Sequence, residues 1–324
     1  MKVCVVGGTG NISTPIVKLL LEQGHDVTLF NRGQRGSASK DVKVIVGDRK
    51  NREDFEAKIK AEKFDVAIDM ICFEKMDALS DIRAFAGVSH FIQVSTVCTY
   101  GINFDFLPAT EDHPLRPITD YGKNKVAADS VFMQAYHRDG FPVTIIKPST
   151  TFGPQTGLFR QVTWDRSWPA RIEEGRPLVI LGEGFTPHQF LHVNDAAPCF
   201  VHVLGREKCI GQTYNMMDCG FTTWKTWHQT AMKVIGKEVE LVGVTMAQLD
   251  AFDVPGRSAS KEIFGHNSYY SNEKILRDIP EFNPQFSLEQ AMRDVYLKTK
   301  EAGDIPESEN DGWEDSLIKK LQSL

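Results

Sequence analysis

The sequence lacks the features that mark several classes of protein. No apolar run approaches the roughly 18–20 residues needed to cross a bilayer, and the N-terminus leads directly into an apolar strand without a signal-peptide pattern. The six cysteines form no C-x-x-C pair, so neither a metal site nor a disulfide framework is predicted. Scattered single cysteines fit a reducing compartment, and we expect a cytoplasmic protein.

An excess of positive charge is also missing. The chain has 37 Lys and Arg against 43 Asp and Glu, a net charge of −6, which counts against a nucleic-acid-binding surface. Its 324 residues, 41% of them hydrophobic, are enough for one large domain or two smaller ones. With 25% charged residues as well, the composition is ordinary for a soluble enzyme.

The first half of the chain alternates short apolar runs with amphipathic segments. The predicted strands are residues 2–6, 27–30, 42–46, 66–71, 91–94 and 143–147, and the predicted helices are 14–23, 54–60 and 119–137. Strands buried on both faces and alternating with helices indicate a parallel sheet. We therefore predict an α/β fold with a Rossmann-type doubly wound sheet and a smaller C-terminal substrate-binding domain.

The domain boundaries follow a change of pattern near residue 152, where the alternation weakens and Trp, Pro and Gly become frequent. We predict an NAD(P)-binding domain over residues 1–151 together with a return helix within about 190–213. The predicted substrate-binding region comprises 152–189 and 214–300. An acidic linker and a terminal helix that docks on the body or on a second subunit follow over 301–324.

A glycine-rich turn, Gly7-Gly8-Thr9-Gly10-Asn11-Ile12-Ser13, follows the first predicted strand. Between a strand and a helix, such a turn lets backbone N–H groups and the helix dipole face a pyrophosphate. The third glycine position, where the helix packs closely on the strand, is Ser13. The predicted cofactor contacts in this turn are Gly7, Thr9, Gly10, Asn11 and Ile12.

The residues after the second and third predicted strands bear on the choice of cofactor. An acid after the second strand would bind the ribose 2′-hydroxyl of NAD, but the sequence there is Asn31-Arg32. Arg32 suits a 2′-phosphate, which favours NADP over NAD; in the alternative, Arg32 stacks on adenine or faces solvent. Asp48 is predicted to accept from the adenine amino group, or else to cap the next helix.

Three Y-x-x-x-K pairs occur in the chain: Tyr121/Lys125, Tyr270/Lys274 and Tyr296/Lys300. So short a motif arises by chance, and only its surroundings give it meaning. Tyr121 alone begins a helical stretch 25 residues after a hydroxyl residue, Thr96, at the end of an apolar run. Thr96, Tyr121 and Lys125 are therefore the predicted site of hydride chemistry on an alcohol or ketone.

These motifs together resemble the extended short-chain dehydrogenase/reductase family, the group of sugar-nucleotide epimerases and dehydratases. The segments that carry the resemblance are Gly7–Ser13, Ser95–Gly101, the Tyr121/Lys125 pair, Lys147–Pro154 and Phe190–Asp195. The resemblance covers nearly the whole chain. It implies a Rossmann fold and an NAD(P)-dependent epimerase or dehydrogenase/reductase, and it leaves open whether the cofactor is recycled or exchanged.

The resemblance also implies a role for each residue. Tyr121 would be the general acid/base on the substrate oxygen, and Thr96 would hydrogen-bond the reacting hydroxyl. Because a tyrosine with a pKa near 10 is a poor base at neutral pH, Lys125 and the positive nicotinamide would stabilise its phenolate. Lys125 would also hold the nicotinamide ribose, and Pro148 is included among the cofactor contacts.

Departures from the family pattern bear on the substrate. Val97-Cys98 follow Thr96 where dehydratases of the family carry Asp-Glu, and His188-Gln189 replace an Arg-Asp pair common in nucleotide-sugar epimerases. Both changes remove groups typical of those sites, so we predict a smaller sugar or polyol derivative. Cys98 is a candidate second acid/base, its alternative being a small buried apolar residue.

The region after Gly153-Pro154 supplies further substrate candidates. Arg160, Trp164 and Arg166 suit a sugar face next to an anionic group, although a packed loop explains them equally well. His188 is predicted to contact substrate as well.

Two other functions stay open at this point. Some relatives with a similar Asn-Arg-Gly after the second strand are RNA-binding proteins of chloroplasts, and another possibility is a catalytically silent NAD(P)-sensing protein. The presence of Thr96, Tyr121 and Lys125 argues against both. The family further implies a homodimer through two long helices, one of them the predicted helix 119–137.

Overall fold

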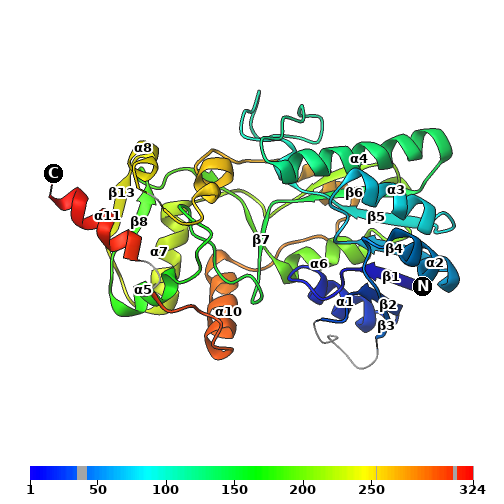
Figure 1. Ribbon diagram of the computed structural model, residues 1–324, viewed down its shortest axis with the longest axis horizontal. Helices are drawn as coiled ribbons and strands as arrows, with labels where there is room; N and C mark the ends of the chain where they lie inside the picture. Colours follow the sequence, from blue (N-terminus) through cyan, green and yellow to red (C-terminus); the bar gives the residue numbers. More distant parts are fainter. Residues whose placement is uncertain (35–41, 253, 309–311, 324) are drawn as a thin grey trace. The chain divides into compact units, whose positions relative to one another are not determined.

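The computed structural model describes residues 1–34, 42–252, 254–308 and 312–323 (Figure 1). Its contacts divide the chain into two compact units, and each is described by itself. Unit 1 comprises Met1–Thr151, Val193–Met217 and Tyr270–Pro284. Unit 2 comprises Phe152–His192, Asp218–Tyr269 and Gln285–Leu324. Residues 270–284, assigned above to the substrate-binding region, therefore lie in unit 1.

Unit 1 is built on a seven-stranded parallel sheet with the strand order β11-β6-β5-β4-β1-β2-β3 (Figure 1). Its strands are β1 (Lys2–Val6), β2 (Asp26–Asn31), β3 (Lys43–Val46), β4 (Val66–Asp69), β5 (His90–Val94), β6 (Val143–Pro148) and β11 (Thr213–Met216). The order reverses between β1 and β4, and the carboxyl ends of strands at such a point form the usual ligand crevice. The predicted Rossmann-type sheet is confirmed.

Helices in two groups flank this sheet. The helices of unit 1 are α1 (Ser13–Glu22), α2 (Arg52–Glu62), α3 (Lys75–Ala84), α4 (Asp120–Asp139), α6 (Val193–His202) and α9 (Glu273–Asp278). Helix α1 contacts α6, while α3 contacts both α2 and α4. Between α4 and the sheet, Phe132 stacks on Phe91 with ring centroids 5.1 Å apart. Apolar strands thus bury their side chains against a helix layer, as a doubly wound sheet requires.

Several elements of this unit differ from those predicted from the sequence. Neither α3 nor β11 was predicted, and β4 ends at Asp69 instead of Ile71. The backbone leaves the sheet at Asp69 because the Asp69 carboxylate accepts the Ile71 N–H at 2.6 Å, which turns the chain. This turn matters below, because the loop that it begins reaches the candidate site.

Unit 2 is made of short strands and helices around an aromatic core. Its strands are β8 (Leu178–Leu181), β9 (Pro187–His188), β10 (Phe190–His192), β12 (Thr222–Thr223) and β13 (Leu241–Val244), and β7 (Thr150–Phe152) leads into it. Its helices are α5 (Trp168–Glu174), α7 (Trp224–Ile235), α8 (Met246–Asp250), α10 (Leu288–Glu301) and α11 (Gly312–Gln322). Trp168, Trp224 and Trp227 are fully buried in its core. Over the described ranges, no helix has the length and apolarity to span a bilayer.

Candidate active site

A cavity of about 670 Å³ lies at the carboxyl ends of β1 to β4 in unit 1. It is lined by Gly7, Thr9, Gly10, Phe30, Asn31, Arg32, Gly33, Gln34, Gly47, Asp48, Arg49, Lys50, Ile71 and Phe73. Six of the predicted cofactor contacts belong to this lining. Asn11, Ile12, Lys125 and Pro148 do not, although Asn11 and Ile12 continue the same turn.

The glycine turn between β1 and α1 is closed by a serine hydroxyl. Gly7 has a φ of +83°, a left-handed conformation that favours glycine, and a Cβ there would meet Ile71 Cγ2 at 2.7 Å. The Ser13 hydroxyl accepts the Gly10 N–H at 2.7 Å and donates to the Gly7 carbonyl at 2.8 Å. Ser13, at the third glycine position, therefore holds the turn by hydrogen bonds.

The turn fits the pyrophosphate of a dinucleotide. A Cβ on Gly10 would come no closer than 3.4 Å to a protein atom, so the protein itself leaves room on that side. No side chain caps the first turn of α1, whose N–H groups and dipole attract an anion. Among the described residues, the buried Asn11 side-chain oxygen has no hydrogen-bond partner, so it too can accept from a bound group.

Asn31, Arg32 and Asp48, at the ends of β2 and β3, lie on the cavity wall. The Asn31 side chain accepts the Gly33 N–H at 2.8 Å and so shapes its own turn. Asp48 accepts the Lys50 N–H at 2.9 Å, a turn contact that leaves its contact with adenine a prediction. Arg32 is exposed on the wall of the cavity, and residues 31–34, the described part of the chain at the end of β2, include no acid.

Thr96 follows β5 and begins a short 3-10 turn, Val97–Thr99. The Thr96 hydroxyl oxygen accepts the Cys98 N–H at 3.2 Å, which leaves the hydroxyl hydrogen to be donated elsewhere. The Thr96 side chain lies near enough to the Tyr121 hydroxyl to act on the pKa of Tyr121. The β5 end and the first turn of α4 thus bring the two predicted hydroxyl groups together.

Lys125 lies one helical turn after Tyr121 on α4 and is 1% exposed. Its ammonium group donates to the Cys72 carbonyl at 2.8 Å and to the Val94 carbonyl at 2.6 Å. It lies 5.8 Å from the centroid of the Tyr121 ring and 4.9 Å from that of Phe73. Burial lowers the pKa of Lys125, an effect that nearby acidic groups oppose.

Tyr121 is 45% exposed, so water reaches part of its ring. The protein atoms around its hydroxyl nevertheless raise the pKa of Tyr121, mainly by desolvation, and the Cys98 thiol adds to this. The nearby Thr96 side chain acts in the opposite direction and lowers the pKa of Tyr121. The protein without nucleotide therefore holds Tyr121 as a neutral phenol, and a further cation near the hydroxyl is needed to make it a base.

One loop that lines the candidate site was not predicted from the sequence. Residues 70–74, between β4 and α3, carry Ile71 and Phe73 into the cavity wall and place the Cys72 carbonyl on Lys125. Phe73 is 44% exposed, and its ring centroid is 6.3 Å from that of Tyr121. The position of this loop could have identified it, because loops at the carboxyl ends of parallel strands surround the ligand crevice.

The predicted substrate residues all lie in unit 2. Arg160 is fully buried, and both of its terminal nitrogens donate to Glu314. His188 is buried among aromatic rings, its centroid 5.2 Å from that of Trp224, and burial lowers its pKa to about 3. These two placements favour packing roles.

Trp164 and Arg166 are exposed. The Trp164 indole donates to Ser258 at 2.9 Å, and Arg166 donates to the Thr156 carbonyl at 3.2 Å. Their contact with a substrate stays a prediction.

The other two Y-x-x-x-K pairs have local structural partners. Tyr270 is buried against Tyr100 in unit 1, and Lys274 donates to the Thr213 carbonyl at 2.9 Å. Tyr296 donates to Glu173 in unit 2, as does its neighbour Lys300.

Known proteins resemble this chain in sequence and in fold. The sequence profile of the NAD dependent epimerase/dehydratase family matches residues 3–78 and 71–216. The chain belongs to this family. The prediction of an extended short-chain dehydrogenase/reductase of the epimerase and dehydratase type is confirmed.

Two relatives differ in their described activities. The chain is 24% identical over 245 residues to 2'-dehydrokanamycin reductase of Streptomyces kanamyceticus, covering 75% of this chain and 69% of the relative. It is 25% identical over 310 residues to chloroplast stem-loop binding protein of 41 kDa b of Arabidopsis thaliana. That match covers 91% of this chain and 78% of the relative.

Among solved structures, UDP-glucuronic acid 4-epimerase of Bacillus cereus in complex with NAD has a TM-score of 0.75 at 17% identity. The match covers 93% of this chain and 99% of that one. At this identity the likeness concerns the fold.

Proposed function

We propose that this protein is an NAD(P)-dependent oxidoreductase or epimerase acting on a hydroxyl or keto group of a sugar-like substrate. The observation that carries the proposal is the meeting of Thr96, Tyr121 and Lys125 beside the nucleotide cavity. Phe73 lies between the cavity and these three residues. It lines the cavity, and the centroid of its ring is 4.9 Å from the Lys125 ammonium nitrogen. Family membership supports the reaction class, and the departures in sequence support a smaller substrate.

The proposed chemistry assigns one step to each side chain. Tyr121 moves a proton between its phenolic oxygen and the substrate oxygen. Thr96 accepts from the Cys98 N–H and so directs its own hydrogen toward that same oxygen. Lys125, held by two carbonyls, presents its charge to the phenolate. When bound, the nicotinamide supplies hydride acceptance or donation.

Cys98 has a secondary place in the proposal. Its thiol is half-buried and acts on the pKa of Tyr121, so it lies near the reacting oxygen. Beside a ketone, a thiol there would serve as a second acid/base in epimerisation.

We further propose NADP as the preferred nucleotide. Arg32 is the exposed cation after β2, and the acid that would bind the 2′-hydroxyl of NAD is replaced by Asn31. A guanidinium matches a phosphate with two parallel hydrogen bonds.

The proposal is tested by turnover of NADPH with a panel of keto sugars and polyol ketones. The parent protein, Tyr121→Phe and Tyr296→Phe are compared at equal cofactor saturation. We expect turnover in the parent and in Tyr296→Phe but not in Tyr121→Phe. Equal turnover in Tyr121→Phe would refute the catalytic assignment. Specific retention of RNA without any nucleotide binding would favour the stem-loop relative's type of function instead.

A further inference from the structure

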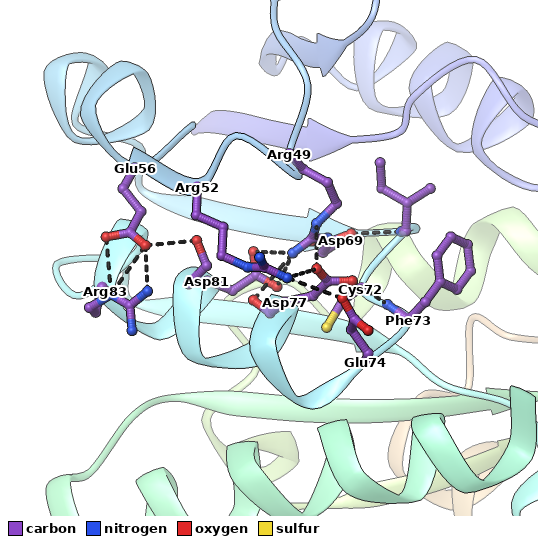
Figure 2. Close-up of polar contacts among 12 residues, drawn as sticks. Arg49, Arg52, Glu56, Asp69, Cys72, Phe73, Glu74, Asp77, Asp81 and Arg83 are labelled. Carbon is purple, nitrogen blue, oxygen red and sulfur yellow. Dashed lines mark hydrogen bonds and ion pairs between the residues drawn. The ribbon is translucent and has the colours of Figure 1, made fainter. Parts of the chain in front are cut away.

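The loop between β4 and α3 is held by a buried group of charges. Asp69, Asp77 and Asp81 are fully buried, and Arg49 is 5% exposed. Arg49 pairs with Asp69 and donates to Asp81 at 3.0 Å (Figure 2). Lys50 donates to Asp77 at 3.1 Å, so the β3–α2 loop supplies cations to the carboxylates of β4 and α3.

Two of these carboxylates hold the loop backbone directly. Asp69 accepts the Ile71 N–H at 2.6 Å, and Asp77 accepts the Phe73 N–H at 3.1 Å (Figure 2). These bonds fix the two residues on either side of Cys72. The orientation of the Cys72 carbonyl is therefore set by the aspartates that flank it.

The Cys72 carbonyl is one of the two acceptors of the Lys125 ammonium. The residues beside it, Ile71 and Phe73, line the nucleotide cavity, and Ile71 fills the space next to Gly7. A shift of this short segment would thus change both the orientation of Lys125 and the shape of the cavity wall.

We infer that Asp77 is a positioning residue for Lys125 and for the nucleotide cavity, acting through the Phe73 N–H and the Cys72 carbonyl. The inference rests on the proposed function, since it concerns the lysine assigned to the phenolate. Asp77 is not among the described residues that line the cavity, and its side chain bonds or pairs with Arg49, Lys50, Arg52 and the Phe73 N–H. Its part is to hold the acceptor that fixes the ammonium.

A simpler explanation is that Asp77 only caps α3. Asp77 is the third residue of that helix, and an acid there is expected to accept a nearby backbone N–H. Capping accounts for the bond to Phe73 but does not require complete burial, or pairing with both Lys50 and Arg52. A cap would affect helix stability and leave the ionisation of Lys125 unchanged.

The pKa of Lys125 distinguishes the two explanations. The groups that act on it are Cys72, Asp129, Asp69 and Arg49, so a change at Asp77 reaches it mainly through geometry. Losing an acceptor disfavours the ammonium form, so displacement of the Cys72 carbonyl lowers the pKa of Lys125 further.

The experiment uses nucleotide-free full-length protein with 13C-labelled lysine. The Lys125 Cε signal, identified by its loss in Lys125→Met, is titrated by NMR, and NADPH affinity is measured separately by fluorescence. In Asp77→Ala we expect the pKa of Lys125 to fall by about one unit and the NADPH Kd to rise about tenfold. Asp77→Asn keeps an acceptor for the Phe73 N–H, so its Lys125 pKa and its NADPH Kd should both lie close to those of the parent.

The matched control is Asp54→Ala, because Asp54 holds the same third position of α2 and pairs with Lys58 at the surface. It should leave both quantities unchanged. If Asp77→Ala does not fold, Asp77→Glu keeps the charge but displaces the acceptor, and the same lowered pKa is expected. A Lys125 pKa equal to the parent's in a folded Asp77→Ala or Asp77→Glu protein would overturn the inference.

The NMR titration needs no nucleotide, so it separates this inference from the proposed function. A parent protein that binds no NADPH contradicts the proposed function alone.

Discussion

At the scale of single residues, Tyr121 and Tyr296 share a spacing to lysine but not an environment. Tyr121 contacts a threonine hydroxyl beside a buried lysine, whereas Tyr296 donates to a glutamate on the surface of unit 2. Tyr121→Phe should lower turnover by about 10²–10⁴-fold with little change in NADPH affinity, because it removes only the proton-transferring group. Steady-state kinetics with Tyr296→Phe as control measure this, and a loss in Tyr296→Phe of the same size would contradict it.

A second residue-scale prediction concerns pH. The positive ring of NADP⁺ favours the phenolate, so the pKa of Tyr121 is lower in the complex than in the nucleotide-free protein, where burial raises it. NADP⁺ affinity therefore rises with pH between these two pKa values, by up to about tenfold per pH unit. Binding titrations from pH 7 to 10 should show this rise for NADP⁺ and not for NADPH. If NADP⁺ affinity still rises with pH in Tyr121→Phe, a titrating group other than Tyr121 is responsible.

Arg32 gives the third prediction. Arg32→Gln should weaken NADPH binding about tenfold or more and leave NADH binding nearly unchanged, because only NADPH carries the 2′-phosphate. Arg83→Gln is the control, since Arg83 pairs with Glu56 on the surface and lies outside the cavity lining. Equal weakening of both nucleotides would mean that Arg32 contacts adenine instead.

The sequence was informative about residues whose chemistry is local. The glycine turn, Thr96 and the Tyr121/Lys125 pair could be found because short motifs at the ends of strands and helices carry their own spacing. Arg160 could not be interpreted in this way, since its partner Glu314 lies 154 residues away. A buried arginine and a substrate-binding arginine look the same until the partner is known.

At the scale of elements, the apolar strands were predicted well and α3 was not. The buried side of α3 includes Asp77, Ser80 and Asp81, so the apolar spacing that indicates a helix is interrupted. These polar residues are buried because Arg49, Lys50 and Glu56 reach them from the preceding loop and from α2. Helix α3 was missed because paired polar side chains occupy positions where a buried helix usually has apolar residues.

Helix α11 is the element with the clearest energetic prediction. Its Glu314 carboxylate is fully buried, accepts hydrogen bonds from Arg160 and the Val179 N–H, and forms an ion pair with Arg171. Glu314→Ala leaves two buried arginines without this partner and should destabilise the protein by about 3–5 kcal/mol. Denaturant unfolding measures the loss.

The neighbouring residue provides the control for that prediction. Asp315 pairs with Arg171 and Arg176, but its side chain is 50% exposed, so Asp315→Ala should cost about 1 kcal/mol or less. Equal losses in the two variants would contradict the structural role given to Glu314. The contacts of Glu314 with Arg160 and Arg171 hold the terminal helix on unit 2, in keeping with the predicted docking on the body. Residues 309–311 of the predicted linker lie outside the described residues.

At the scale of the whole molecule, one unit carries the cavity and the Thr-Tyr-Lys residues that we propose as the active site, and the other carries an aromatic core with exposed Trp164 and Arg166. The fold and the family could be inferred from ordered motifs along the chain. The substrate could not, because it depends on which side chains of unit 2 are exposed and which are used in packing.

The most direct test of the central claim is the binding of nucleotide to emptied protein. Purified protein is denatured to identify any released cofactor, and refolded or stripped protein is then titrated with NAD⁺, NADH, NADP⁺ and NADPH. We predict binding of the dinucleotides with preference for NADPH and loss of that preference in Arg32→Gln. The absence of binding by all four to a folded protein would contradict the proposed active site.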